Sequence, residues 1–519
     1  MGGEYMFRIS GLLILGFVAV AGSAEFARAQ STATATATAP QAIAADEPKT
    51  QSKSIDAILI SVAATSSTAP SGSVSAPPPP AAANGPAASS RPAAAKPPSG
   101  AANAPAASID STAAKSYAWA WPSEPLPSLQ KMMPDIPGLR LTGAIGIWGR
   151  SFPQSPQWDG ESNAVLWPNV EGWVKAEYSW NGGKDRFNFM PYARKDFIGS
   201  RSLVDVKEGY FLHTGDGWSV LAGINTVHWG VTESRHLVNI INQADYAWSI
   251  DGDELLGQPM VNANFTTSMG TLSLYGLFGF RPLQDYDAKD RFRTPLVPDG
   301  HTILASDIEQ NVNFAGRFNS TFPLFGGSID AAVSYFNGVG REPRYVLLAA
   351  TSPSSLPRLT SYYDLINQGG LEIVGTFNSL QLKFEGIIRH EYGETYAATV
   401  AGFEYTFFNV WNSGADVGLV AEHLTDNRSM LQPPTFYAHD VFIGGRFTFN
   451  DSSDTNLLGG ILYNYQDSAE YATARLSTRI RDDLSLTLEG RYFIYAPPED
   501  YLYWILHDSY VQARIIKYF

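Results

Sequence analysis

The sequence predicts an all-β fold, a transmembrane antiparallel β-barrel of about 18 strands over residues 139–519. Three observations predict it. First, residues 139–519 contain segments of roughly ten residues in which apolar and polar side chains alternate, the length and period of a tilted membrane strand. Second, the connections between these segments alternate between short turns and long loops. Third, residues 509–519 form an alternating segment with an aromatic end, as expected of a strand that pairs with the first strand to close a barrel.

Residues 1–29 have the order of a secretory signal peptide. Arg8 precedes an apolar run over residues 9–21, and Ala27-Arg28-Ala29 has the small residues of a cleavage site. The apolar run is shorter than the about 20 residues that a membrane-spanning helix needs. We therefore expect export, with cleavage after Ala29.

Residues 30–116 consist mostly of Ala, Pro, Ser and Thr. Such a segment buries too little apolar surface to offset the entropy cost of ordering it, so we expect a disordered periplasmic arm. The arm is a candidate to bind a periplasmic partner. Residues 117–138 carry Trp119, Trp121 and five prolines, and we interpret them as a periplasmic lead-in to the first strand, with a plug-like segment as the alternative.

Composition excludes several classes of protein. There is no cysteine, so thiol catalysis, thiolate metal sites and disulfide scaffolds are all excluded. The net charge of −14 argues against nucleic acid as a partner. Beyond the signal peptide, no stretch reaches the about 18 consecutive apolar residues that indicate a membrane helix. A soluble two-sheet β-sandwich is the alternative. It explains neither the alternating segment with an aromatic end at residues 509–519 nor the alternation of short and long connections.

The rhythm of connections supports an even number of strands. Short turns rich in Gly, Asn, Asp and Ser are predicted at 181–183, 214–217, 269–271, 378–379, 412–414, 450–452 and 481–483. Long connections are predicted around 230–260, 281–309, 338–366, 423–440 and 496–508. With both ends of the barrel in the periplasm, the alternation closes at about 18 strands, or at 16 if the weak segments 204–214 and 366–378 are not strands.

Arginine recurs on the polar face of the last strands. A cationic side chain on the lipid face costs about 2–4 kcal/mol near the bilayer midplane, so these arginines are predicted to face the lumen. They are expected to form one basic wall. The set is Arg446, Arg475, Arg479, Arg491 and Arg514.

The connection around residues 230–260 is the most distinctive local sequence. Thr232 or Ser234 can cap a short helix whose apolar side is Leu237, Ile240 and Ile241. We expect this connection, the third extracellular loop, to fold into the barrel and face the basic wall. It could also remain an external loop that carries acidic residues. Its candidate constriction residues are Glu233, Arg235, His236, Asp245, Asp251, Asp253 and Glu254.

Catalytic and metal motifs are weak. Asp251-Gly252-Asp253-Glu254 has the oxygen density of a calcium site but lacks the EF-hand spacing, so no ion is predicted. No H-E-x-x-H or G-x-S-x-G sequence occurs. His390-Glu391-Tyr392 is the polar cluster that comes closest to a catalytic motif. Glu394 stands where the H-E-x-x-H motif of a zinc-binding helix would need its second histidine. We therefore predict no catalytic residue, cofactor or metal.

Two segments resemble outer-membrane proteins of Gram-negative bacteria. Residues 509–519 resemble the C-terminal signature that the barrel-assembly machinery recognises, with Phe519 as its final residue and Lys517 as a departure from the usual apolar residue. The loop resembles the third loop of general porins. Trp229-Gly230, Ile241-Asn242 and Asp245 are also similar to large uncharacterised proteobacterial barrels with a W-G-E…I-N-P-x-D sequence.

The resemblance implies an outer-membrane location, contact with outer-membrane lipid and passive diffusion of small hydrophilic solutes. The predicted basic wall suggests a preference for anionic or zwitterionic solutes. A structural or export-partner barrel that recruits periplasmic machinery through its arm is the alternative, and a surface enzyme acting on lipid or polysaccharide is a third. The sequence specifies neither the solute nor the oligomeric state.

Overall fold

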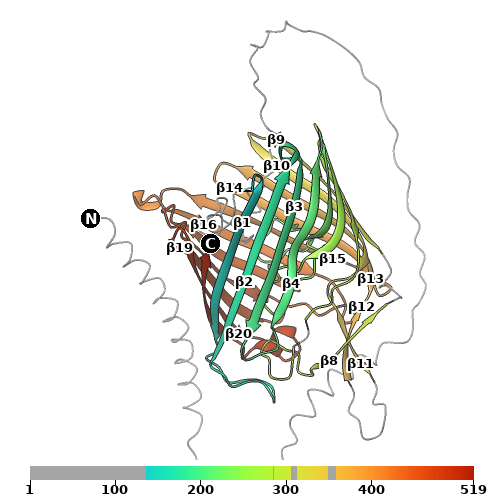
Figure 1. Ribbon diagram of the computed structural model, residues 1–519. Helices are drawn as coiled ribbons and strands as arrows, with labels where there is room; N and C mark the ends of the chain where they lie inside the picture. Colours follow the sequence, from blue (N-terminus) through green and yellow to red (C-terminus); the bar gives the residue numbers. More distant parts are fainter. Residues whose placement is uncertain (1–135, 285, 306–311, 349–357) are drawn as a thin grey trace, which may run out of the picture. The chain divides into compact units, whose positions relative to one another are not determined.

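Figure 1 shows the computed structural model, which describes residues 136–284, 286–305, 312–348 and 358–519. The predicted signal peptide (1–29), the arm (30–116) and nearly all of the lead-in (117–138) lie outside the described residues. No helix in the described part of the chain is long and apolar enough to cross a membrane. The strands of the first half are β1 (Leu139–Ser151), β2 (Leu166–Trp180), β3 (Asp185–Asp196), β4 (Leu203–Thr214), β5 (Trp218–Asn225), β6 (Gln258–Thr267), β7 (Gly270–Leu277), β8 (Pro298–Leu304), β9 (Asn313–Leu324) and β10 (Gly327–Val339).

The second half continues the same pattern of antiparallel neighbours. Its strands are β11 (Arg344–Leu348), β12 (Arg358–Tyr363), β13 (Leu365–Phe377), β14 (Leu380–Glu391), β15 (Glu394–Phe407), β16 (Asp416–Asp426), β17 (His439–Thr448), β18 (Asn456–Asn464), β19 (Glu470–Arg481), β20 (Leu484–Tyr495) and β21 (Tyr510–Tyr518). Within the described residues, the short 3₁₀ helices η2 (Asn181–Gly183), η4 (Val410–Asn412) and η5 (Tyr501–Ile505) lie in connections.

Eighteen of these strands close into one barrel. Each pairs antiparallel with its neighbour in the ring, and β1 pairs with both β2 and β21. The N–H of Phe519 donates to the carbonyl of Gly143 at 2.8 Å, and the N–H of Gly143 donates to the carbonyl of Phe519 at 3.2 Å. The prediction of 18 strands is confirmed, and the two weak segments are the strands β4 and β13.

The closing strand β21 shows how the pleat sorts side chains. Val511 and Ile515 are exposed on the outer face, whereas Gln512 and Arg514 are buried on the inner face. Lys517 follows the outward register, beside the exposed Ile145 of β1, and its ammonium pairs with Asp483 in the adjacent turn. A lysine at the edge of a lipid-facing surface can keep its charge solvated in this way. The departure at Lys517 is therefore compatible with a lipid-facing strand.

The two ends of the barrel differ as expected, with some exceptions. All seven predicted short turns connect consecutive strands at one end, and an eighth that the sequence did not suggest, at residues 325–326, joins β9 to β10. At the other end, the connections 197–202, 392–393 and 465–469 are short although long loops were expected there. Phe325 adopts a positive φ of 49°, unusual for an aromatic residue, which explains why this turn lacked a clear signal.

Two long connections contain a second sheet that the sequence did not predict. β12 pairs with β11 in an antiparallel arrangement and with β8 in a parallel one. These strands come from the connections between β7 and β9 and between β10 and β13, so they lie at the long-loop end (Figure 1). Their short length and distant pairing leave little local signal.

Candidate functional site

The connection between β5 and β6, residues 226–257, crosses the lumen of the barrel. Lys207 of β4 pairs with Glu254 of this loop, and Glu422 of β16 accepts hydrogen bonds from the N–H groups of Glu233 and Ser234, each at 2.7 Å. β4 and β16 are the fourth and thirteenth strands of the 18-strand ring, so they lie on opposite sides. Since Lys207 and Glu422 lie in the middle of their strands, the loop runs inside the barrel at mid-height.

The prediction of a short helix in this loop is wrong. Residues 226–257 contain no helix, and Thr232 does not act as a cap. Its N–H and its hydroxyl both donate to Oε1 of Glu385 on β14, at 2.9 and 2.6 Å. Carboxylates on the wall thus hold the backbone at the start of this loop in a non-helical path.

Three glutamates on the wall hold the start of the loop, and we call them the glutamate row. They are Glu372 of β13, Glu385 of β14 and Glu422 of β16. Glu372 accepts from the N–H of Gly230 at 2.8 Å, and Glu385 accepts from the N–H of Val231 at 2.6 Å. Most of these hydrogen bonds come from backbone amides, and the hydroxyls of Thr232 and Ser234 add two more, so the row fixes the path of the loop backbone.

Gly230 is required for this close approach. Its φ is +121°, and an added Cβ would lie 2.8 Å from Nδ1 of His236 and 3.0 Å from Oε1 of Glu385. Any other residue would therefore strain the backbone and displace the glutamate. The Trp229-Gly230 pair noted in the sequence has a packing reason, because Trp229 is itself buried against Tyr275 of β7.

The apolar residues of the loop are buried as expected, although not on a helix. Leu237, Ile240 and Ile241 join the hydrophobic cluster that includes side chains from the inner faces of the strands. Arg341, from the β10–β11 connection, donates to the carbonyls of Ile240 and Ile241 at 3.2 and 2.8 Å. This middle part of the loop is therefore packed like a protein core and not like a solvated loop.

One edge of the loop is attached to the wall formed by β3 and β4. Arg194 of β3 pairs with Asp245 at 2.7 Å, and both side chains are buried. Glu254 pairs with Lys207 of β4. The two acids were predicted to meet the basic wall of the last strands, but the structure brings them to this other side of the ring.

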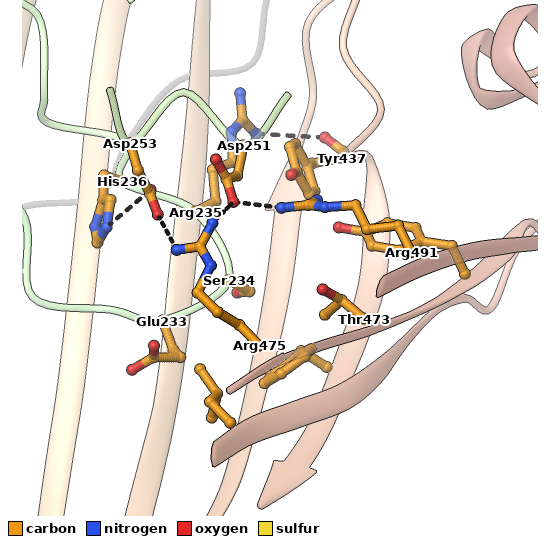
Figure 2. A pocket seen from close by; sticks show the side chains of 13 residues that line it. Glu233, Ser234, Arg235, His236, Asp251, Asp253, Tyr437, Thr473, Arg475 and Arg491 are labelled. Carbon is orange, nitrogen blue, oxygen red and sulfur yellow. Dashed lines mark hydrogen bonds and ion pairs between the residues drawn. The ribbon is translucent and has the colours of Figure 1, made fainter. Parts of the chain in front are cut away.

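The opposite edge meets the predicted arginines. Glu233 pairs with Arg446 of β17 at 2.5 Å. Asp251 pairs with Arg475 of β19 at 3.3 Å and also with Arg491 of β20. Figure 2 shows these two guanidinium groups converging on the single carboxylate of Asp251. The structure therefore brings three of the five predicted arginines together with acids of the loop.

The two remaining arginines lie elsewhere. Arg514 of β21 pairs with Glu171 of β2 at 2.5 Å, and its guanidinium carbon lies 4.5 Å from the ring centroid of Trp248 in the loop. Arg479 lies near the short-turn end of β19 and is exposed. It is far along the strand from Arg475, so it is not part of the arginine group at the loop.

The wall is not uniformly basic, because acids occupy the same inner face. Glu489 of β20 pairs with Arg475 at 2.8 Å, and Glu404 of β15 pairs with Arg446 at 3.0 Å. Glu171 and the glutamate row add further carboxylates. The sequence could have predicted Glu489, because it lies two residues from Arg491 in the same strand and therefore on the same face.

A cavity lies between the loop and the wall of β17–β20. The space that the centres of water-sized molecules can occupy in it is about 60 Å³. Charged groups from the loop and the wall line it, together with Tyr437, Phe442, Leu458 and Tyr471. This combination of a few convergent polar groups and an apolar surface is typical of small-molecule sites.

Within the cavity the charges alternate in sign. His236, Asp253, Arg475, Asp251 and Arg491 form a series of neighbouring ion pairs, which we call the charge relay (Figure 2). Burial alone would lower the pKa of His236, but the nearby carboxylates, above all Glu385 at 3.6 Å, raise the pKa to about 9. Burial and the neighbouring Asp251 raise the pKa of Asp253 to about 6. At neutral pH the relay therefore carries charges of both signs.

Comparisons with known proteins give likeness of fold only. No family model and no curated protein matches the chain. Among solved structures, a mutant of the Rh. blastica porin is 10% identical with a TM-score of 0.37, covering 73% of this chain and 100% of that one. OprB of Pseudomonas putida is 8% identical with a TM-score of 0.39, covering 74% and 94%. A BenF-like porin of Pseudomonas fluorescens is 10% identical with a TM-score of 0.43, covering 74% and 97%.

Proposed function

We propose that the protein is an outer-membrane channel of porin type for passive diffusion of small hydrophilic solutes, with residues 226–257 as its constriction. The observation that carries the proposal is a loop that crosses a closed barrel at mid-height and leaves a polar cavity against one wall. Barrels of 16–18 strands are wide enough for an aqueous passage, whereas eight-stranded ones are filled by side chains.

The arrangement of charge supports a filter. Acids of the loop pair directly with guanidinium groups of the wall, at Glu233–Arg446 and Asp251–Arg475, and the second pair lines the cavity. Opposed charges in a narrow passage create a transverse field that orients polar solutes. The acids found among the arginines make the lining nearly balanced in sign, so the preference for anions expected from a basic wall is reduced.

Recording ion current in planar bilayers tests the proposal. Full-length protein and a variant lacking residues 31–114 are purified in detergent and inserted side by side. Both are expected to give discrete conductance steps, because the barrel alone forms the passage. An electrically silent protein that is nevertheless folded would contradict the channel.

The same pair of proteins separates the channel from the alternative functions. A scaffold that recruits periplasmic machinery should lose its cellular role without residues 31–114, whether or not it conducts. An unchanged phenotype together with unchanged conductance favours the channel. A surface enzyme would instead reveal itself by turnover of lipid or polysaccharide, which the channel does not require.

A further inference from the structure

The charge relay has two loose links, and both involve Asp253. The carboxylate of Asp253 is 3.6 Å from Nη1 of Arg475 and 3.9 Å from Nε2 of His236. These separations are too long for hydrogen bonds. By contrast, Asp251 is held tightly, since it pairs with Arg491 and accepts from the hydroxyl of Ser249. The relay therefore has hydrogen-bonding capacity left over at Asp253.

Unused capacity also exists beside the relay. Oε1 of Glu233 is buried and makes no hydrogen bond, and Nδ1 of His236 and Nε of Arg491 are buried at ion-pair distances only, 3.6 Å from Glu385 and 3.5 Å from Glu489. Two of these atoms belong to cations and one to an anion. Buried polar atoms without partners are costly, and a bound polar molecule is one way of satisfying them.

Aromatic and apolar side chains also line the cavity. Phe442 of β17 lies over Gly444 and Gly460, where an added Cβ would come within 2.8 and 2.5 Å of its ring. The two glycines thus leave room for the ring to lie along the wall. Tyr471 and Leu458 line the cavity together with this ring. Flat aromatic rings contact the C–H faces of cyclic molecules over a large area.

We propose that this cavity binds a neutral, polyhydroxylated cyclic solute, a monosaccharide, as the channel's preferred cargo. The inference rests on the proposed function, because it names the class of solute for the same passage. A hydroxyl group both donates and accepts, so hydroxyls can bridge Asp253 to His236 and to Arg475 across the two loose links. The opposite face of the sugar ring lies against Phe442 and Tyr471.

Ionic solutes fit the same lining less well. A carboxylate placed near Arg475 and Arg491 would be repelled by Asp251 and Asp253, which already face those guanidinium groups. An ammonium placed near Asp253 would meet His236 and Arg475. An uncharged solute avoids both repulsions and still uses the hydrogen-bonding groups of both signs.

The test uses full-length protein with glucose as the probe. Isothermal titration in detergent should show saturable glucose binding, and glucose should reduce ion current in bilayers over the same concentration range. Asp253→Asn should weaken glucose binding about tenfold, because a hydrogen bond to a charged group is lost. Asp482→Asn, which makes the same change on an exposed turn, should leave binding unchanged. A gel-mobility shift on boiling verifies that each variant is folded.

Two other probes separate the classes of solute. Benzoate is an aromatic anion and glycine betaine is a zwitterion, and neither should displace glucose. Tighter binding of either probe than of glucose, or equal glucose affinity in Asp253→Asn and the parent, would overturn the inference. Ion current without saturable glucose binding would overturn the inference alone. Absence of ion current would overturn the proposed channel itself.

Discussion

Arg475 and Arg491 lie on neighbouring strands and share one carboxylate, that of Asp251. Each position was predictable from the alternation of its own strand, because lipid on one face forces a guanidinium group to the other. Their common partner was not predictable, since Asp251 is more than 200 residues away in the chain. Such pairs decide the local charge of the passage, and they can be tested one residue at a time.

Replacing Arg475 and Arg491 together with glutamine should shift ion selectivity toward cations. The change removes two positive charges from the cavity and leaves Asp251 and Asp253 less neutralised. The measurement is the reversal potential in a salt gradient. Arg479→Gln is the matched control, because Arg479 is exposed near the short-turn end of the same strand β19. Unchanged reversal potential and conductance in the double variant would show that these arginines are not at the constriction.

The pH dependence of ion selectivity should follow the protonation of Asp253. Its pKa is raised to about 6, so it is ionised at pH 8 and protonated at pH 5. Lowering the pH across this range adds one positive charge to the cavity while His236, with a pKa of about 9, stays protonated throughout. Cation preference should therefore fall on acidification, with a midpoint near pH 6. In Asp253→Asn this step should be missing, and its persistence would assign it to another group.

At the scale of elements, the sequence predicted the position of the loop of residues 226–257 correctly, but the helix predicted within it does not form. Its apolar residues at helical spacing do become buried. The glutamate row holds the backbone amides at the start of the loop in a non-helical path, and no local pattern in residues 226–257 indicates carboxylates that lie on β13, β14 and β16.

Weakening the glutamate row should release the start of the loop. The variant Glu385→Gln with Glu422→Gln keeps the size of both side chains but removes their charge. Each hydrogen bond to a charged acceptor contributes about 1.5–3 kcal/mol, so the loop should open more often. Higher and noisier single-channel conductance is expected. Glu177→Gln is the control, because Glu177 lies near the short-turn end of β2 and pairs with Arg186.

Proteolysis gives an independent measurement of the same release. Cleavage within residues 226–257 should become faster in the double variant and remain slow in the Glu177→Gln control. Equal cleavage rates, with equal conductance noise, would mean that packing of Leu237, Ile240 and Ile241 holds the loop without the glutamates.

At the scale of the whole molecule, closure of the ring is the property with the widest consequence. Hydrogen bonding between Phe519 and Gly143 joins the last strand to the first, so no strand of the ring has an open edge. Open edges are not tolerated in hydrocarbon. The outward side chains, such as Ile147, Val511 and Ile515, are apolar and exposed, which suits contact with lipid.

Cell fractionation should recover the protein with the outer membrane, as expected for a closed barrel with an apolar outer surface. Its band on a denaturing gel should move after boiling, because barrels resist detergent until heated. A protein that stays in the soluble periplasmic fraction and shows no mobility shift would contradict the membrane location. A variant with Ile147 and Ile515 both replaced by aspartate should accumulate less in the membrane, since each outward charge costs free energy in lipid.

The sequence by itself determined the strands of the barrel, their number, seven of the eight short turns and the inward position of Arg446, Arg475, Arg491 and Arg514. These features follow from local rules, namely period-two alternation, turn residues and the cost of charge in lipid. The tertiary structure alone decided the path of residues 226–257, the glutamate row and the cavity. Gly230 and Glu372, for example, are 142 residues apart and meet only because the ring closes and brings β13 opposite the loop. Contacts of that span depend on the closed barrel and leave no trace in the spacing of neighbouring residues.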